Sequence, residues 1–357
     1  MVLNYIIVAF SMLGALDRIF GNKLGIGKEF ERGLLFFGNI ALAMIGMLVI
    51  APYLVELIKP ALGNFKDIFH IDPSIIPASL FANDMGGASL ATELALDEKI
   101  GLYNGLVVSS MLGCTISFTI PTSLGLVKDE KQKPLLIGLL CGIITIPFGC
   151  FVGGLVYKVP FGELMTNLLP IIIFSGILAI ALFLFPNGCV KVFKVFGIFI
   201  KMLITIGLAL GIFTYLTDIE LIKGLDSFEN AAAICVKAAV VMTGTFPLIF
   251  VLSKLLANPL RWLGSKMGIS GSAVMAMISS LATSYPTFEM MNNMENKGIL
   301  LNGAFSVSGA FILAAHLAFT MSFAPELLPA VMTGKIVAGL LSIFLGLFVY
   351  KKLKKDL

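Results

Sequence analysis

The chain has 357 residues, of which 58% are hydrophobic and only 13% charged, and its formal net charge is +4. Soluble domains carry about a quarter charged residues, so this composition excludes a water-soluble protein and indicates one embedded in a membrane. Two histidines and five dispersed cysteines exclude a histidine metal cluster, a paired-cysteine zinc site and a disulfide framework. The basic residues at the C-terminus fit a cytoplasmic anchor better than nucleic-acid binding.

The chain opens with an apolar run that lacks the features of a secretory signal peptide, so we predict a membrane span there. Lys and Arg are concentrated in the linkers at residues 21–32, 126–134, 187–194 and 259–268. The linkers poor in Lys and Arg, or mostly acidic, lie at residues 63–72, 158–164, 217–230 and 323–330. The positive-inside rule places the first group in the cytoplasm and the second outside. The N-terminus is then outside and the Lys-rich C-terminus is cytoplasmic.

Two apolar segments, about residues 73–96 and 100–125, lie between an outside linker and an inside linker. Two full crossings would return the chain to the outside, so one segment must enter and leave by the same face. The first is interrupted by Asp84-Met85-Gly86-Gly87, which predicts a re-entrant hairpin, because protein or water can surround non-helical backbone at membrane depth. The same reasoning predicts a second hairpin at about 270–294, broken at Ser284-Tyr285-Pro286-Thr287.

An internal repeat appears when the chain is compared with itself at a spacing of 198 residues, over about residues 30–118. Matched pairs are Phe30 with Phe228, Glu31 with Glu229, Gly46 with Gly244, Ser74 with Ser272, Lys99 with Lys297, and Asn104 with Asn302. After a five-residue change of register, Tyr157 matches Tyr350. Because the two halves start on opposite sides of the membrane, the repeat is predicted to be inverted.

The predicted fold is therefore an all-α polytopic membrane protein with about nine transmembrane helices and two re-entrant hairpins. The first repeat covers residues 1–160 with its hairpin at about 73–96, and residues 161–190 form a connecting span. The second, inverted repeat covers residues 191–357 with its hairpin at about 270–294. Inverted repeats with broken helices are typical of secondary transporters, which hold substrate near the bilayer midplane. The two hairpin tips are predicted to meet and to frame the substrate.

Asp84 is the sharpest candidate for binding, since an ionisable group inside the membrane is a functional candidate by default. Gly86 and Gly87 beside it allow the backbone to approach a ligand closely. The Asp84 carboxylate would neutralise a cationic substrate or a coupling ion; the alternative is that it caps the second helix of the hairpin. Asn83 adds an amide that can donate and accept.

At the second tip, Ser284, Tyr285 and Thr287 supply hydroxyl groups that suit a hydroxyl-bearing ligand. The alternative is that these hydroxyls only satisfy the open backbone around the break. Asn104 and Asn302 are equivalent by the repeat and begin the span after each hairpin. Each either contacts the substrate or forms the turn or cap that is typical of an Asn-Gly pair.

Four further ionisable positions allow two interpretations each. Glu93 follows the first break and is either a site residue or a carboxylate solvated near a membrane face. His316 lies mid-span and either relays a proton or is held by a neighbouring carbonyl. Lys237 and Lys335 also lie within spans, where they would bind an anionic substrate unless their long side chains reach a membrane face. No catalytic motif is present, so neither an enzyme nor a cofactor is expected.

At these motifs the sequence resembles the ethanolamine-utilisation transporters of the EutH type. Other matching stretches are Asp17-Arg18-Ile19, Ser110-Met111-Leu112-Gly113, Ile120-Pro121, Gly142 to Cys150, Gly224-Leu225-Asp226 and Asn302 to Phe319. The resemblance implies a multi-pass protein of the bacterial plasma membrane that imports ethanolamine. Its partners would be ethanolamine and membrane lipid, with no nucleic acid.

An ammonium group suits a carboxylate or an aromatic face, so the resemblance and the Asp84 motif favour the same substrate. The alternative is an importer of small organic anions on the same two-hairpin fold, which would use the lysines. A passive channel is a further alternative. The coupling ion and the oligomeric state are open, although carriers with moving hairpins often assemble as dimers or trimers.

Overall fold

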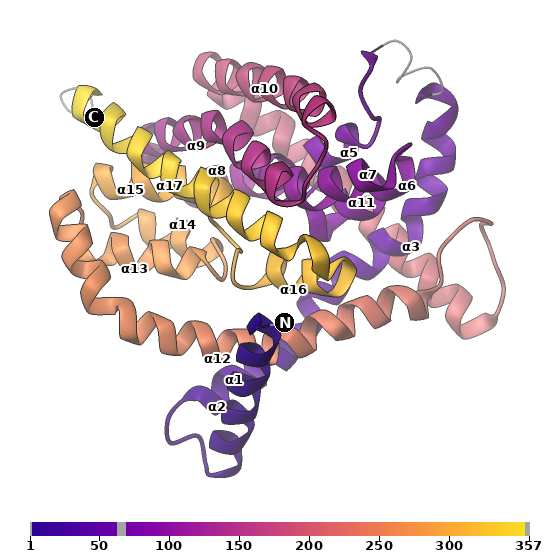
Figure 1. Cartoon of the computed structure of the whole chain (residues 1–357), viewed down its shortest axis with the longest axis horizontal. Coiled ribbons are helices and arrows are strands. Elements are labelled where there is room, and N and C mark those ends of the chain that lie inside the picture. Colours follow the sequence, from indigo (N-terminus) through magenta and orange to yellow (C-terminus); the bar gives the residue numbers. More distant parts are fainter. Residues whose placement is uncertain (1, 63–68, 354–357) are drawn as a thin grey trace.

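The computed structural model describes residues 2–62 and 69–353 (Figure 1). Every regular element in those ranges is a helix. The longer helices are α1 (Val2–Ile19), α2 (Ile26–Leu35), α3 (Phe37–Leu62), α9 (Asp129–Val156), α10 (Phe161–Leu184), α11 (Pro186–Thr217), α12 (Phe228–Met267), α13 (Gly271–Ser280), α15 (Asn296–Ser308) and α17 (Leu328–Leu353). The shorter helices are α5 (Ile75–Leu80), η1 (Asn83–Met85), α6 (Gly87–Leu94), α7 (Glu98–Tyr103), η2 (Asn104–Gly113), η3 (Thr115–Thr119), α8 (Ile120–Leu126), α14 (Tyr285–Met291), α16 (Ala315–Phe323) and η4 (Pro325–Leu327).

Seven helical stretches within the described ranges are long and apolar enough to cross a bilayer. They are Ile26–Pro60, Glu98–Leu126, Asp129–Val156, Phe161–Leu184, Asn187–Thr217, Phe228–Leu255 and Pro325–Leu353. The chain is therefore a multi-pass membrane protein. The predicted count of nine is not confirmed, because α1 and the segment from α15 to α16 are not among the seven. The latter is interrupted by a non-helical turn at residues 309–314.

The first predicted hairpin is a pair of short helices that fold back on one another. Helices α5 and α6 pack together, and the chain between them is non-helical around the short helix η1. Their outer ends are tied by Asp72, whose Oδ2 accepts from the backbone N–H groups of Leu96 at 3.0 Å and Asp97 at 3.2 Å. The segment therefore starts and ends at the same place. Much of the predicted outside linker at 63–72 lies outside the described residues.

The second predicted hairpin has the same construction. Helices α13 and α14 pack together, with a break between Ser280 and Tyr285. The backbone N–H of Ser270 donates to Glu295 Oε1 at 2.7 Å, which again joins the two ends of the segment. The 198-residue spacing matches Ser270 to Asp72 and Glu295 to Asp97. The two ends of each segment are thus joined at equivalent positions. The carboxylate is at the start of the first segment (Asp72) and at the end of the second (Glu295).

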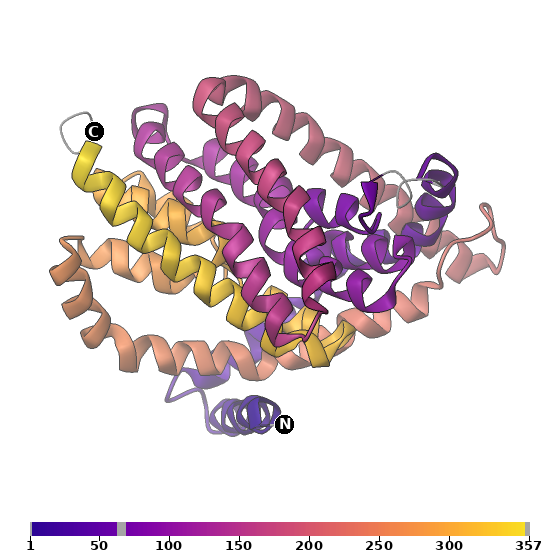
Figure 2. The same cartoon turned by 45° about the horizontal axis from the view of Figure 1, so that its top comes forward.

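Helices α9 and α17, which follow the hairpin region of each half, pack against each other in opposite directions. The hydroxyl of Thr145 donates to the carbonyl of Ala338 at 3.1 Å. Nearer the C-terminal end of α9, Gly149 faces Gly334. Small residues let the two backbones approach, as is usual between helices in membranes. Helix α10 covers the other side of α9, so the three helices lie side by side (Figure 2).

Each hairpin is fixed to the end of the antiparallel helix of its own half. The Lys99 ammonium lies 5.6 Å from the ring centre of Tyr157, and that of Lys297 lies 5.5 Å from the ring centre of Tyr350. These are the pairs that the repeat matches. Because α9 and α17 run in opposite directions, their ends, and therefore the two hairpins, lie at opposite ends of this helix pair.

The first helix of each half packs against the other half. Helix α1 packs on α12, and α11 packs on α3. A Cβ added to Gly244 would collide with the carbonyl of Ile7, and one added to its repeat partner Gly46 would collide with the carbonyl of Ile204. The same glycine thus permits the same close approach of helices in both halves.

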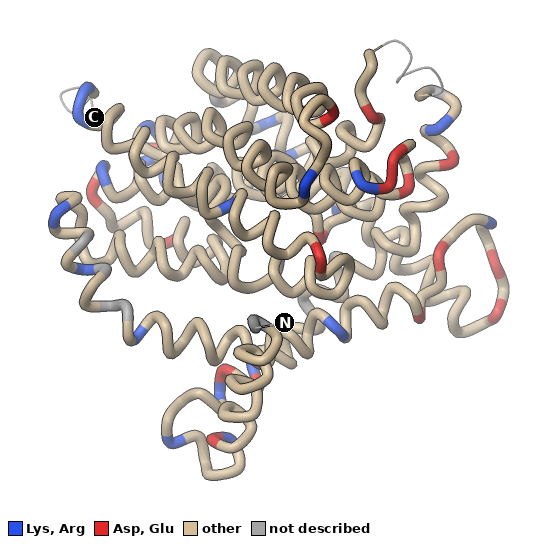
Figure 3. The backbone as a smooth tube through the Cα atoms, in the orientation of Figure 1, with Lys and Arg blue, Asp and Glu red and all other residues tan. Residues whose placement is uncertain are grey.

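The charges divide between the two ends of the molecule. Helices α12 and α17 end on the same side, where the backbone carries mostly Lys and Arg (Figure 3). The connection between α11 and α12 lies on the opposite side and carries mostly Asp and Glu. The predicted inside linker at 126–134 also meets the exit of the second hairpin, since Lys131 Nζ donates to the carbonyl of Met294 at 3.2 Å.

Candidate functional site

The tips of the two hairpins line one cavity of about 410 Å³, which is far more than a single water needs. Asp84 and Met85 come from the first tip, and Thr283 and Tyr285 come from the second. The remaining lining residues are Phe36, Ile40, Met44, Ala82, Cys114, Phe118, Phe311, Ala315 and His316. Residues from both helix breaks therefore line the same cavity.

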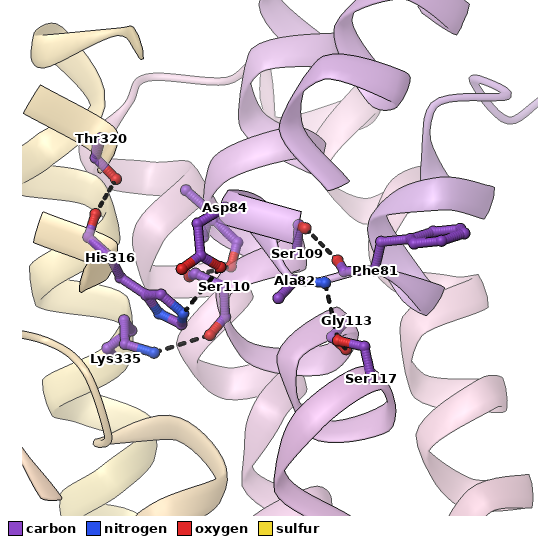
Figure 4. Close-up of polar contacts among 11 residues, drawn as sticks. Phe81, Ala82, Asp84, Ser109, Ser110, Gly113, Ser117, His316, Thr320 and Lys335 are labelled. Carbon is purple, nitrogen blue, oxygen red and sulfur yellow. Dashed lines mark hydrogen bonds and ion pairs between the residues drawn. The ribbon is translucent and has the colours of Figure 1, made fainter. Parts of the chain in front are cut away.

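Asp84 and His316 are the charged or basic side chains that face this cavity. His316 Nε2 lies 3.9 Å from Asp84 Oδ1, and the Asp84 side chain is 20% exposed while that of His316 is 2% exposed (Figure 4). His316 Nδ1 is buried and has no hydrogen-bond partner among the described residues. The cap alternative for Asp84 is not observed, because helix α6 begins after Gly86 without a side-chain cap.

Aromatic rings form much of the remaining wall. Phe118 and Phe311 meet edge to face with ring centres 5.3 Å apart, and Phe311 lies 5.2 Å from the His316 ring. Aromatic faces attract cations through the ring quadrupole, and the attraction grows when water is excluded. A carboxylate surrounded by such rings is suited to a small organic cation.

Phe311 has an unusual backbone conformation, with φ at +62°. A bulky residue in this left-handed region is a genuine outlier, and such residues cluster at functional sites. Its backbone N–H donates to the carbonyl of Ser280 at 2.9 Å, and that of Leu313 donates to the carbonyl of Leu281 at 2.9 Å. The turn at 309–314 thus satisfies the open backbone of the second tip and turns an aromatic ring into the cavity.

The first tip is held differently, by hydroxyl groups of the following span. The backbone N–H of Ala82 donates to Ser117 Oγ at 3.0 Å, and the hydroxyl of Ser109 donates to the carbonyl of Phe81 (Figure 4). Ser109 and Ser117 lie in the π-helical elements η2 and η3. π-Helical turns of this kind are frequent at functional sites.

Gly86 completes the first tip with φ at +103°. An L side chain there would be strained, and its Cβ would also collide with the side chain of Met47. Gly87 packs against Ser109 and the carbonyl of Phe81, so it permits the close contact between the tip and η2. Neither glycine lines the cavity.

Two predicted polar residues are buried at the tips without a partner. Asn83 and Ser284 are fully buried, and their side-chain polar atoms have no hydrogen-bond partner among the described residues. Buried polar groups are normally paired, so such atoms are available to a ligand or a water. They do not line the cavity itself.

Four other predicted residues have structural contacts or lie at the surface. Thr287 donates to the carbonyl of Ala276 at 2.7 Å, between the two arms of its hairpin. Asn104 Nδ2 donates to Ser74 Oγ at 2.8 Å, and Asn302 Nδ2 donates to the carbonyl of Ala273 at 2.9 Å. The two equivalent Asn residues therefore tie each hairpin to the span that follows it. Glu93 is exposed and away from the cavity.

The two lysines within apolar helices differ sharply. Lys237 is exposed on α12, whereas Lys335 is 1% exposed and its Nζ donates to the carbonyl of Ser110 at 2.8 Å. Figure 4 shows Lys335 beside His316, whose imidazole points toward Asp84. Its position within an apolar segment made Lys335 a candidate in the sequence, but the sequence does not show which residues lie next to it.

A second cavity of about 240 Å³ adjoins the first, and Phe36 and Thr283 line both. Its wall includes Arg32, whose guanidinium lies 3.2 Å from Glu29 and 5.1 Å from the ring centre of Phe246. Phe36 and Phe246 also meet edge to face at 5.6 Å. Phe36 and Thr283 thus lie at the boundary between the cavity at the tips and a second cavity that contains the Glu29–Arg32 ion pair.

Among the described residues, no three His, Cys, Asp or Glu side chains are grouped so as to hold a metal ion. The aromatic residues Phe118 and Phe311 were missed in the sequence, where they are two of 29 phenylalanines. The repeat could have indicated Phe118, because the 198-residue spacing matches it to His316.

Comparison with known proteins finds one family and several relatives that match nearly the whole chain. Residues 1–349 match the family described as "Ethanolamine utilisation protein, EutH". The chain is 38% identical over 354 residues to the "Probable ethanolamine permease EutH" of Listeria monocytogenes, covering 99% of this chain and 95% of that protein. It is 32% identical to the protein of the same name from Salmonella typhimurium, covering 98% and 95%. It is also 33% identical to the "Uncharacterized protein YxeR" of Bacillus subtilis, covering 94% and 90%. No solved structure matches the chain.

Proposed function

Because the chain belongs to the EutH family of ethanolamine-utilisation proteins, we propose that it is a secondary transporter that imports ethanolamine across the bacterial plasma membrane. The observation that carries the proposal is the cavity between the two hairpin tips, with one carboxylate and several aromatic rings in its wall. No Lys or Arg is among the lining residues. Such a wall favours a small cation over an anion.

Each part of ethanolamine has a matching group. The ammonium would lie between the Asp84 carboxylate and the rings of Phe118 and Phe311. The hydroxyl would reach the imidazole of His316 or the hydroxyl of Tyr285, both of which line the cavity. The amine is mostly protonated at neutral pH and crosses lipid poorly, so its import needs a carrier.

We infer that transport proceeds by alternating access between two inverted repeats. Three features support this inference: the hydrogen bonds that join the ends of each hairpin, the antiparallel packing of α9 and α17, and the packing of α1 and α11 on the opposite half. In this scheme a unit that bears the hairpin tips, together with α9 and α17, moves against a scaffold that includes the first span of each half, α1 and α11. The chamber lined by Arg32 would be the cytoplasmic exit, with Phe36 as the residue that closes it.

The charge distribution supports an orientation with the N-terminus outside and the C-terminus in the cytoplasm. The ends of α12 and α17, where Lys and Arg gather, would face the cytoplasm (Figure 3). The acidic connection between α11 and α12 would face the outside.

A second candidate function is the import of small organic anions, which the buried Lys335 favours. Its Nζ donates to a backbone carbonyl, however, and it does not line the cavity. An anion in that cavity would also meet the Asp84 carboxylate. We therefore rank this candidate second.

The deciding experiment is uptake of labelled ethanolamine into proteoliposomes that hold the purified protein, at mildly acidic pH where diffusion of the neutral amine is small. We expect saturable uptake that excess unlabelled ethanolamine inhibits and a dicarboxylate does not. In the D84N variant, uptake should fall by roughly 100-fold or more, because the bound ammonium loses its counter-charge.

The matched control is D218N, which makes the same change at an exposed residue that ends α11. It should transport at the wild-type rate. Uptake by D84N equal to that of D218N would disprove the role of Asp84, and competition by the dicarboxylate alone would favour the anion importer.

A further inference from the structure

Lys335 is a buried cation that the proposed binding mode does not use. It lies within α17, a helix long enough to span the membrane, and is 1% exposed. Its Nζ makes one hydrogen bond, to the carbonyl of Ser110 in η2 (Figure 4). A charge in such a place is expensive to bury and is usually paired with an opposite charge.

Four ionisable groups from other parts of the chain interact electrostatically with Lys335. They are the carboxylate of Asp84, the imidazole of His316 and the thiols of Cys114 and Cys150. Asp84 is the one carboxylate among these groups, and it interacts electrostatically with the Lys335 ammonium. Lys335 does not line the cavity, so it does not occupy the space that is open to the substrate.

We propose that Lys335 is a fixed counter-charge that keeps the empty site electrically neutral, so that the empty carrier can return across the membrane. This inference rests on the proposed function. When an ammonium occupies the cavity, the site carries one net positive charge. When the substrate leaves, Asp84 and Lys335 balance each other, and no unpaired charge has to move through the low-dielectric interior.

The consequence differs between two modes of transport. Net uptake requires the empty carrier to return, whereas exchange of labelled for unlabelled substrate uses only the loaded carrier. Without the charge of Lys335, the empty site would hold an unpaired carboxylate, while the loaded site would be neutral. Loss of this charge should therefore stop net uptake and spare exchange.

The test compares the two modes in proteoliposomes, either empty or preloaded with unlabelled ethanolamine. The variant K335Q removes the charge but keeps an N–H group that can donate to the Ser110 carbonyl. Its net uptake should fall by roughly 100-fold, while exchange changes by less than about threefold. The variant K335R, which keeps the charge, should recover net uptake. The control K237Q makes the same change at the exposed lysine of α12 and should leave both modes unchanged.

The ratio of net uptake to exchange decides the outcome. A wild-type ratio in K335Q would overturn the inference, since a role limited to the hydrogen bond with Ser110 predicts that result. Failure of K335R to raise the ratio above that of K335Q would also overturn it. If the wild-type protein transports no ethanolamine in either mode, the proposed function fails first.

Discussion

The two hairpins meet the same physical demand in different ways. Each breaks a helix inside the protein, and the freed backbone groups need partners because the membrane supplies none. In the first half, the hydroxyls of Ser109 and Ser117 pair with the backbone of Phe81 and Ala82. In the second half, the following span unwinds at residues 309–314, and its own backbone pairs with Ser280 and Leu281.

The framework around the two tips is alike in the two halves, whereas the tips themselves differ. The ties between the hairpin ends and the lysine–tyrosine pairs occur in both halves. The carboxylate, in contrast, occurs on the first tip and the imidazole on the span of the second half. A framework with matched contacts in both halves therefore surrounds a site whose two sides differ.

The largest expected effect comes from the left-handed glycine of the first tip, which the second tip does not need. In G86V, a β-branched side chain would be forced to a φ of +103° and against Met47. We expect a loss of stability of roughly 2–5 kcal/mol. Thermal unfolding in detergent measures it. The change S284G, at the equivalent position, should cost less than about 1 kcal/mol, and equal losses would refute the asymmetry.

A smaller effect is expected from the hydroxyls that hold the first tip. In S117A the backbone N–H of Ala82 loses its acceptor, and this should lower the free energy of unfolding by about 1–3 kcal/mol. The matched control is S308A, since Ser308 is fully buried and its hydroxyl has no partner among the described residues. That change should be close to neutral. A greater loss in S308A than in S117A would contradict our account of the tips.

The smallest effect concerns His316 and its repeat equivalent, Phe118. In H316F both halves would carry phenylalanine at this position, and the cavity would lose the group proposed to meet the substrate hydroxyl. The KM for ethanolamine should rise about tenfold, the loss of one hydrogen bond, while the fold is retained. Kinetics of uptake with ethanolamine and with ethylamine, which lacks the hydroxyl, would measure this. An equal rise for both amines would argue against a hydroxyl contact.

The sequence by itself determined the class of the protein and the places where its helices break. Charged residues are too few for a soluble surface, and Asp84, Gly86 and Pro286 interrupt apolar segments at matched positions. The prediction that the two tips frame one site rests on the repeat. These features are local in the chain or are fixed by its internal similarity, so a pattern can reveal them.

Only the tertiary structure decided which other residues surround the site. The turn at 309–314 and the left-handed backbone of Phe311 depend on pairing with a segment about 30 residues away, which no local pattern records. The difference between Lys237 and Lys335 is equally invisible in the sequence, since both lie in apolar helices. One faces outward and the other meets Ser110, because the packing of whole helices, and not the local sequence, decides which face of a helix is buried.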